Sequence, residues 1–231
     1  MKKVEHAKSK RFKELEVLVD KSKSYGIEEA VELAQKTSNT KFDSGIEVHV
    51  KLGINPKKTD QLVRSSVALP NGNGKSVRVA VITTDATQQK AAKAAGAELI
   101  GDQDILNDIK AGKIDFDVLV ATPDSMKLLA PIAKILGPKG LMPNPKDGTV
   151  TQNIGDAVTS LKKGKVSFKN DDSANIHVMI GKASFETPKL IENYKALIDS
   201  ILKAKPTGAK GSYIKSVNIA STMGPGIKVS L

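Results

Sequence analysis

The most unusual group of polar and small residues lies near the end of the chain, in the hexapeptide STMGPG at residues 221–226. The Thr222 hydroxyl can donate and accept hydrogen bonds, and the Met223 side chain can lie flat against a ribose or a base edge. The two glycines let the backbone approach another molecule closely, and the proline fixes its conformation. A rigid turn would also explain this composition, so the segment alone leaves both interpretations open.

The side chains that most often serve in catalysis or metal binding are scattered along the chain and form no recognisable site. The three histidines, His6, His49 and His177, lack the spacing of metal ligands. The carboxylates form no recognisable pair, and the absence of cysteine excludes disulfides, thiol catalysis and cysteine-ligated zinc. We therefore expect no enzyme, no metal and no other cofactor.

The charge of the chain indicates a polyanionic partner. The formal net charge is +11, which favours nucleic acid first and an anionic membrane second. Residues 1–70 hold 14 Lys and Arg against 10 Asp and Glu, residues 160–231 hold 12 against 5, and residues 71–159 hold 10 of each. We interpret this distribution as a neutral domain, residues 71–159, inserted into a discontinuous basic domain, residues 1–70 and 160–231.

The basic segments predict an antiparallel sheet covered by helices. Residues 45–53, 174–181 and 217–231 contain runs in which apolar and polar residues alternate, as in strands with one buried face. An amphipathic helix is expected over TPKLIENYKALIDSILK, capped by Thr187 with Pro188 in its first turn, and a second helix over IEEAVELAQK. The expected fold class is therefore an α+β sandwich for the discontinuous domain.

The neutral segment predicts a small Rossmann-like parallel α/β domain. VRVAVI and DVLVATPD are typical of buried strands, and helix-forming stretches such as ATQQKAAKAAG and SMKLLAPIAKILG alternate with them. A nucleotide site in this domain would favour an enzyme. However, the two glycine motifs of nucleotide-binding loops are incomplete. NGNGKS ends like a phosphate loop, but Leu69 stands where the first glycine of that loop is needed, and TTDAT follows the first strand in place of GxGxxG. The sequence therefore gives little support to a nucleotide site.

Two further observations separate the possible partners. There is no apolar run near 18 residues, no secretory signal and no strongly basic amphipathic helix, which speaks against a membrane-surface protein. Aromatic residues make up only 3% of the chain, too few for a platform that stacks single-stranded bases. We expect recognition of a structured RNA or DNA by its shape, sugars and phosphates.

Four motifs, taken together, resemble the ribosomal protein L1 family, the stalk protein of the large ribosomal subunit, in its bacterial form. They are KFDSGIEVHVKLGINP, LGPKGLMPNPKDGTV, IGKASF and STMGPG, in this order. The resemblance implies that the discontinuous domain binds structured large-subunit ribosomal RNA and that the inserted domain is not an enzyme. It also implies help in releasing deacylated tRNA from the exit site, repression of the protein's own messenger RNA, a cytoplasmic place on the ribosome, and a monomer off it.

The resemblance also implies which residues bind RNA. Lys41 would neutralise a phosphate, and Phe42 is expected to pack beneath the binding surface more than to stack on a base. Thr222 and Ser216 would hydrogen-bond ribose or base edges. Asp172 occupies a position at which a basic residue would favour a phosphate contact. The complete expected set is Lys41, Phe42, Ser173, Ser216, Ser221, Thr222, Met223 and Gly224.

Overall fold

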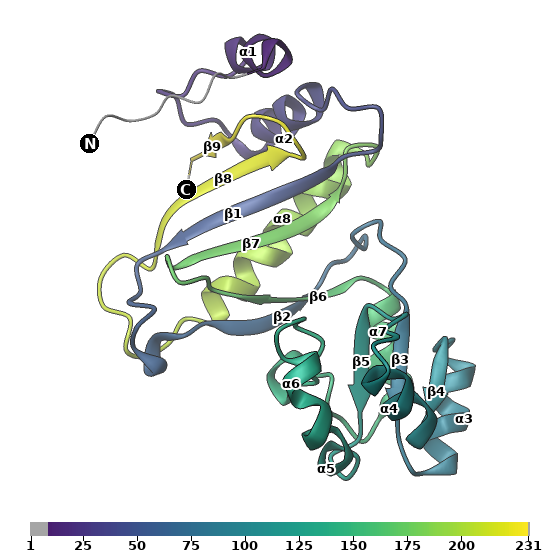
Figure 1. Ribbon diagram of the computed structural model, residues 1–231. Coiled ribbons are helices and arrows are strands. Elements are labelled where there is room, and N and C mark those ends of the chain that lie inside the picture. Colours follow the sequence, from purple (N-terminus) through teal and green to yellow (C-terminus); the bar gives the residue numbers. More distant parts are fainter. Residues whose placement is uncertain (1–8, 231) are drawn as a thin grey trace. The chain divides into compact units, whose positions relative to one another are not determined.

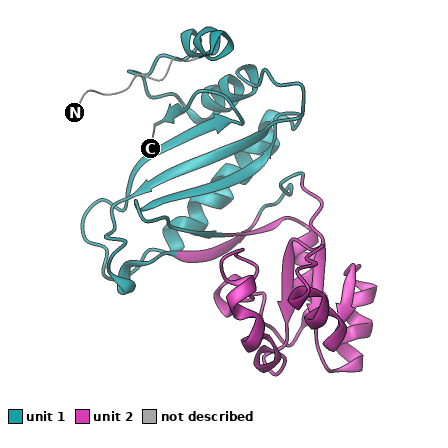
Figure 2. Cartoon of the chain, in the orientation of Figure 1, with its two compact units in different colours: residues 1–63, 69–74, 168–231 teal, residues 64–68, 75–167 magenta. Residues whose placement is uncertain are grey.

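The computed structural model describes residues 9–230, which form two compact units (Figures 1 and 2). Unit 1 comprises residues 1–63, 69–74 and 168–231, and unit 2 comprises residues 64–68 and 75–167. Unit 2 is therefore an insertion in unit 1. Relative to the expected boundaries, residues 71–74 lie in unit 1, and residues 64–68 and 160–167 lie in unit 2.

A four-stranded antiparallel sheet of order β7-β1-β8-β9 forms the centre of unit 1. Its strands are β1 (Gly45–Leu52), β7 (Asn175–Lys182), β8 (Ile214–Ser221) and β9 (Ile227–Val229). Val48 lies opposite Val178 on one side and Ile219 on the other, and all three side chains are buried. The alternation in the sequence thus predicted the antiparallel sheet and its buried face correctly.

Two helices cover the apolar face of this sheet (Figure 1). The helices of unit 1 are α1 (Lys10–Val17), α2 (Ile27–Lys36) and α8 (Thr187–Lys203), with a short 3-10 turn, η1 (Thr59–Gln61). Leu190 and Leu197 of α8 are fully buried. The expected cap is wrong, because Glu186 holds the N-cap position and the Thr187 hydroxyl donates to Gln35 Oε1 at 3.1 Å instead.

A parallel sheet of order β4-β3-β5 forms the centre of unit 2, which confirms the predicted α/β class. One face of β3 buries Ala80 and Ile82 against α4, and the other buries Val79 and Val81 against α3 and α7. Helices thus cover both faces. The elements of this sheet and its helices are β3 (Val79–Ile82), α3 (Ala86–Ala94), β4 (Leu99–Gly101), α4 (Gln103–Lys110), β5 (Val118–Ala121), α5 (Met126–Leu129), η2 (Ala130–Ile132), α6 (Ala133–Leu136), η3 (Pro145–Asp147) and α7 (Ile154–Lys162).

The segment expected as one helix over SMKLLAPIAKILG is divided into α5, η2 and α6. Pro131 lies in the 3-10 turn between the two short helices. A proline within a helix lacks a donor and clashes with the preceding turn, which explains the division. Apolar spacing predicted the buried side chains of this segment but not its interruption.

The proline-rich loop after α6 is fixed to its own unit by a buried carboxylate. Asp147 is 7% exposed, and Arg64 Nε donates to its two oxygens at 3.1 and 3.0 Å. Arg64 begins β2 (Arg64–Ala68), which pairs with β6 (Lys165–Lys169). Gly148 follows with a φ of 71°, a conformation that favours glycine.

Candidate nucleic-acid interface

The turn at the end of β8 presents an apolar side chain to solvent in an unfavourable backbone conformation. Gly224 N donates to Ser221 O at 2.8 Å and closes the turn. Met223 has a φ of 66° and a side chain that is 64% exposed. A non-glycine residue in the left-handed region costs about 1 kcal/mol or more, and such strain is concentrated at functional sites.

Thr222 joins this turn to the first residue of β1. Its backbone nitrogen donates to Gly45 O at 2.9 Å, and its Oγ1 accepts a hydrogen bond from Gly45 N at 3.0 Å. The hydroxyl also lies 3.2 Å from Gly45 O, to which it can donate. Thr222 therefore extends the sheet ladder with its side chain, so its hydroxyl has an internal role in addition to any contact with RNA.

The structure corrects the expectation for Ser221. This residue pairs with Ile46 on the inner face of the sheet and is only 3% exposed. Its Oγ lies 3.3 Å from Thr37 Oγ1. Because strand residues alternate between faces, Ser221 supports the turn from within, and its hydroxyl does not reach the surface that Met223 occupies.

The loop before β1 presents a basic and an aromatic side chain. Lys41 is exposed, and the Phe42 side chain is 57% exposed. The expectation that Phe42 packs beneath the surface is therefore wrong, and its ring is free to stack on a base or a ribose. The Thr40 hydroxyl donates to Phe42 O at 2.7 Å and holds this conformation.

An arginine from α1 connects the loop with the turn. Arg11 Nη1 donates to Asn39 O at 3.1 Å, and Nη2 donates to Met223 O at 3.2 Å. These contacts bring together segments that are far apart in the sequence. Five of the expected residues consequently lie at one end of the sheet, namely Lys41, Phe42, Thr222, Met223 and Gly224.

The other two expected residues lie at the opposite end of the sheet. Ser216 pairs with Lys51, and Lys51 Nζ donates to the carbonyl oxygen of Ser173. Gly45 and Lys51 are six positions apart on β1, which corresponds to about 20 Å at the usual rise of a strand. The candidate interface therefore has two clusters of residues, one at each end of β1.

Asp171 orders the loop that carries Ser173. Its carboxylate accepts hydrogen bonds from Ser173 N at 2.9 Å and from Asn175 N at 2.6 Å. The hydrogen bond from the Asn175 backbone is the main reason that the pKa of Asp171 falls from 3.8 to about 2. The carboxylate is thus charged at neutral pH and tied to its own loop, while the neighbouring Asp172 is exposed.

A polar surface connects the two clusters on the open face of the sheet. His49 pairs with His177 on β7 and with Asn218 on β8, and Asn218 pairs with the exposed Lys228. The Nδ1 atoms of the two histidines are 2.8 Å apart, so one of them carries the shared proton. Burial, followed by the proximity of His177, lowers the pKa of His49 from 6.5.

Sequence reasoning did not name Arg11, Lys51 or Asn218 among the RNA-binding residues. The alternation in GIEVHVKLG and VNIA places Lys51 and Asn218 on the polar face, so that signal was present. The position of Arg11 depends on contacts across 28 and 212 residues. No local pattern indicates such contacts.

Unit 2 does not have the features of a nucleotide site. In doubly wound sheets, ligands bind where the order of the strands reverses, at their carboxyl ends. Here Asp85 follows β3 and caps α3 by accepting a hydrogen bond from Thr87 N at 2.8 Å. A carboxylate in that position repels a phosphate, which weakens the nucleotide alternative.

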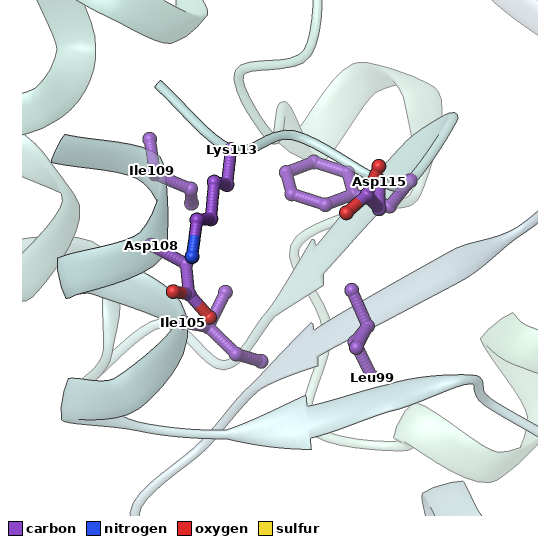
Figure 3. A pocket seen from close by; sticks show the side chains of 7 residues that line it. Leu99, Ile105, Asp108, Ile109, Lys113 and Asp115 are labelled. Carbon is purple, nitrogen blue, oxygen red and sulfur yellow. The ribbon is translucent and has the colours of Figure 1, made fainter. Parts of the chain in front are cut away.

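A cavity of about 160 Å³ lies at the other end of this sheet (Figure 3). Leu99 enters it from the start of β4, and Ile105 and Ile109 enter from α4. The Lys113 ammonium points toward Asp108 (Figure 3). Because the cavity lies near the amino ends of the strands, it does not restore the enzyme alternative.

Within residues 9–230, no cluster of three or more His, Asp or Glu residues could hold a metal ion. Among the same residues, none of the helices combines the length and the apolar composition of a membrane span. His6 lies outside these residues. The sheet of unit 1 presents basic, hydroxyl-bearing and a few apolar side chains on its polar face, the class of surface that suits a protein that binds structured RNA.

Comparison with known proteins agrees with this class. Residues 34–225 match the model of the ribosomal protein L1p/L10e family. A large ribosomal subunit protein uL1 of Chromobacterium violaceum is 49% identical over 221 residues, which are 96% of this chain and 95% of that protein. One of Saccharopolyspora erythraea is 49% identical over 222 residues, or 96% and 93%. The chain belongs to the ribosomal protein L1p/L10e family and is a ribosomal protein, not an enzyme.

Proposed function

We propose that this chain binds a structured segment of large-subunit ribosomal RNA through the open face of the sheet in unit 1. The names of its relatives, the net charge of +11 and the polar surface between the two clusters support this proposal. Unit 1 corresponds in this proposal to the discontinuous RNA-binding domain, and unit 2 to the inserted domain.

The observation that carries the proposal is the exposed Met223 in its left-handed conformation. Neither folding nor solubility favours an apolar side chain that is 64% exposed on a strained residue. Contact with a ribose or a base edge would bury this side chain and offset the strain. The exposed Phe42 ring, in the loop that Arg11 joins to this turn, offers a second apolar contact of the same kind.

The two clusters would have different roles in binding. Lys41 provides a phosphate contact at the first cluster, and Lys51 provides positive charge between the hydroxyl-bearing Ser173 and Ser216 at the second. A separation of about 20 Å along β1 allows both clusters to contact one RNA fold but not one nucleotide. Shape would thus select the RNA, which agrees with the small number of aromatic residues.

Two finer functions follow from the family resemblance. On the ribosome, we propose that the protein helps deacylated tRNA leave the exit site. Off the ribosome, the same surface would bind a similar fold in the protein's own messenger RNA and repress its translation. The second function requires only that the messenger presents the same backbone shape and the same base edges to the clusters.

The test is a comparison of binding to a large-subunit stalk RNA fragment and to a scrambled RNA of equal length across a salt series. We expect tighter binding to the stalk fragment, and a loss of about tenfold or more for that RNA alone in Met223→Ala. Lys41→Gln should weaken binding to both RNAs and lower the salt slope by about one unit. The control is Lys195→Gln in α8, on the helical side of the sheet, which should change neither the affinity nor the salt slope. Equal, steeply salt-dependent binding to both RNAs would contradict the proposal.

A further inference from the structure

The first helix of the chain makes a polar contact with both segments of the first RNA-binding cluster. The outer nitrogens of Arg11 reach two backbone carbonyl groups, Asn39 O at 3.1 Å and Met223 O at 3.2 Å. One of these residues lies just before Lys41, and the other is the exposed methionine of the turn. A planar guanidinium connects two separate carbonyls in this way through two nitrogens in fixed positions, whereas an ammonium has only one nitrogen.

Few residues of α1 are buried in unit 1, although Phe12 is partly so. Leu15 is its one buried residue, while Val17 at its end is 86% exposed. The hydrogen bonds of Arg11 are the contacts that tie α1 directly to both segments of the cluster. The same bonds fix the carbonyl of Met223, whose left-handed conformation a flexible turn would otherwise relax.

From this geometry we infer that Arg11 is a positioning residue for RNA recognition. It holds the loop at residues 39–42 and the turn at residues 221–224 in the mutual arrangement that the RNA contacts. This inference rests on the proposed function, because it assigns a role within the same surface. As a consequence, a residue of α1, which is not part of the sheet, should affect the affinity for RNA by holding the two segments in place.

The decisive variant is Arg11→Lys, which keeps the charge but has a single nitrogen in place of the two outer nitrogens that contact Asn39 O and Met223 O. We expect its affinity for the stalk RNA fragment to fall about 5- to 30-fold, as for the loss of one or two charge-assisted hydrogen bonds. The salt slope should stay as in the wild type because the charge is unchanged. Lys13→Arg, on an exposed position of the same helix, is the matched control and should bind as the wild type does.

A second measurement tests the bridge without RNA. The chain has five methionines, and the methyl resonance of Met223, assigned with Met223→Leu, reports on the turn. In the free Arg11→Lys protein this resonance should narrow and move toward the random-coil position, while the resonance of Met179 on β7 stays in place. If the wild type does not distinguish the two RNAs, the proposed function fails, but the methyl resonance still tests the bridge.

Two results would overturn the inference. The first is an Arg11→Lys protein that binds the stalk RNA fragment as the wild type does, with an unchanged Met223 resonance. The second is an equal loss of affinity for stalk and scrambled RNA together with a lower melting temperature, since that pattern indicates general destabilisation and not a lost arrangement of two segments.

Discussion

Gly224→Ala should destabilise the turn for an internal reason, although the sequence suggests that this glycine permits close approach of RNA. A Cβ atom at this position would lie 2.2 Å from Ser221 Oγ. Ser221 is 3% exposed and its Oγ is held near Thr37 Oγ1, so it has little room to move away. Overpacking of this kind typically costs about 1–3 kcal/mol.

Removal of the obstructing hydroxyl should restore the turn. In the double variant Ser221→Ala/Gly224→Ala, the nearest remaining atoms to the new Cβ are Ser221 O at 3.2 Å and the Cβ of residue 221 at 3.4 Å. The Ser221→Ala change alone loses one long hydrogen bond, worth about 0.5–1.5 kcal/mol, while Thr37 Oγ1 still donates to Ala34 O. We therefore expect the two changes to compensate each other by about 1–2 kcal/mol.

The assay is a thermal melt of the wild type, the two single variants and the double variant, together with the affinity of each for the stalk RNA fragment. Each kcal/mol corresponds to a shift of about 2–4 °C for a chain of this size. Gly226→Ala is the control, because nothing lies within 4 Å of a Cβ there. The reasoning is refuted if Gly224→Ala melts like the wild type, or if the double variant regains its stability but not its affinity, since the glycine would then serve the RNA directly.

Two further predictions concern charge inside each unit. The pKa of His49 is lowered in the folded chain, so below about pH 6.5 the unfolded chain takes up a proton that the folded chain resists, and stability should fall. His49→Gln should therefore reduce the change of the melting temperature between pH 7.5 and 5.5. Arg64→Met leaves the buried carboxylate of Asp147 without its guanidinium, so unit 2 should lose about 2–4 kcal/mol in urea unfolding, and Arg64→Lys should lose less. A pH profile that His49→Gln does not change, or a neutral Arg64→Met, would contradict these assignments.

The fold was predictable wherever one physical signal dominated. Alternation in GIEVHVKLG and ANIHVMIG fixes which side chains enter the core, and the sheet follows from that choice. Local details were less accessible. The cap of α8 moved by one residue because Thr187 hydrogen-bonds to Gln35 on another helix, and apolar spacing could not show the interruption at Pro131.

The candidate site was predictable as a set of segments but not as a geometry. The motif at residues 41–42 and the motif at residues 221–224 were identified separately, and only the contacts of Arg11 and Gly45 show that they form one cluster. The exposure of the Phe42 ring was also inaccessible, because it depends on which neighbours the loop meets after folding.

Adjacent residues of STMGPG have different roles because the strand ends within the motif. Ser221 still follows the alternation of β8 and points into the core, while Thr222 completes the ladder with its hydroxyl. Met223 then takes the left-handed conformation that turns its side chain outward, and Gly224 leaves room for the serine beneath it. A motif of small residues can therefore be required partly for its own folding. Variants that separate the internal from the external role, such as Ser221→Ala/Gly224→Ala, are needed before each residue of such a motif is counted as an RNA contact.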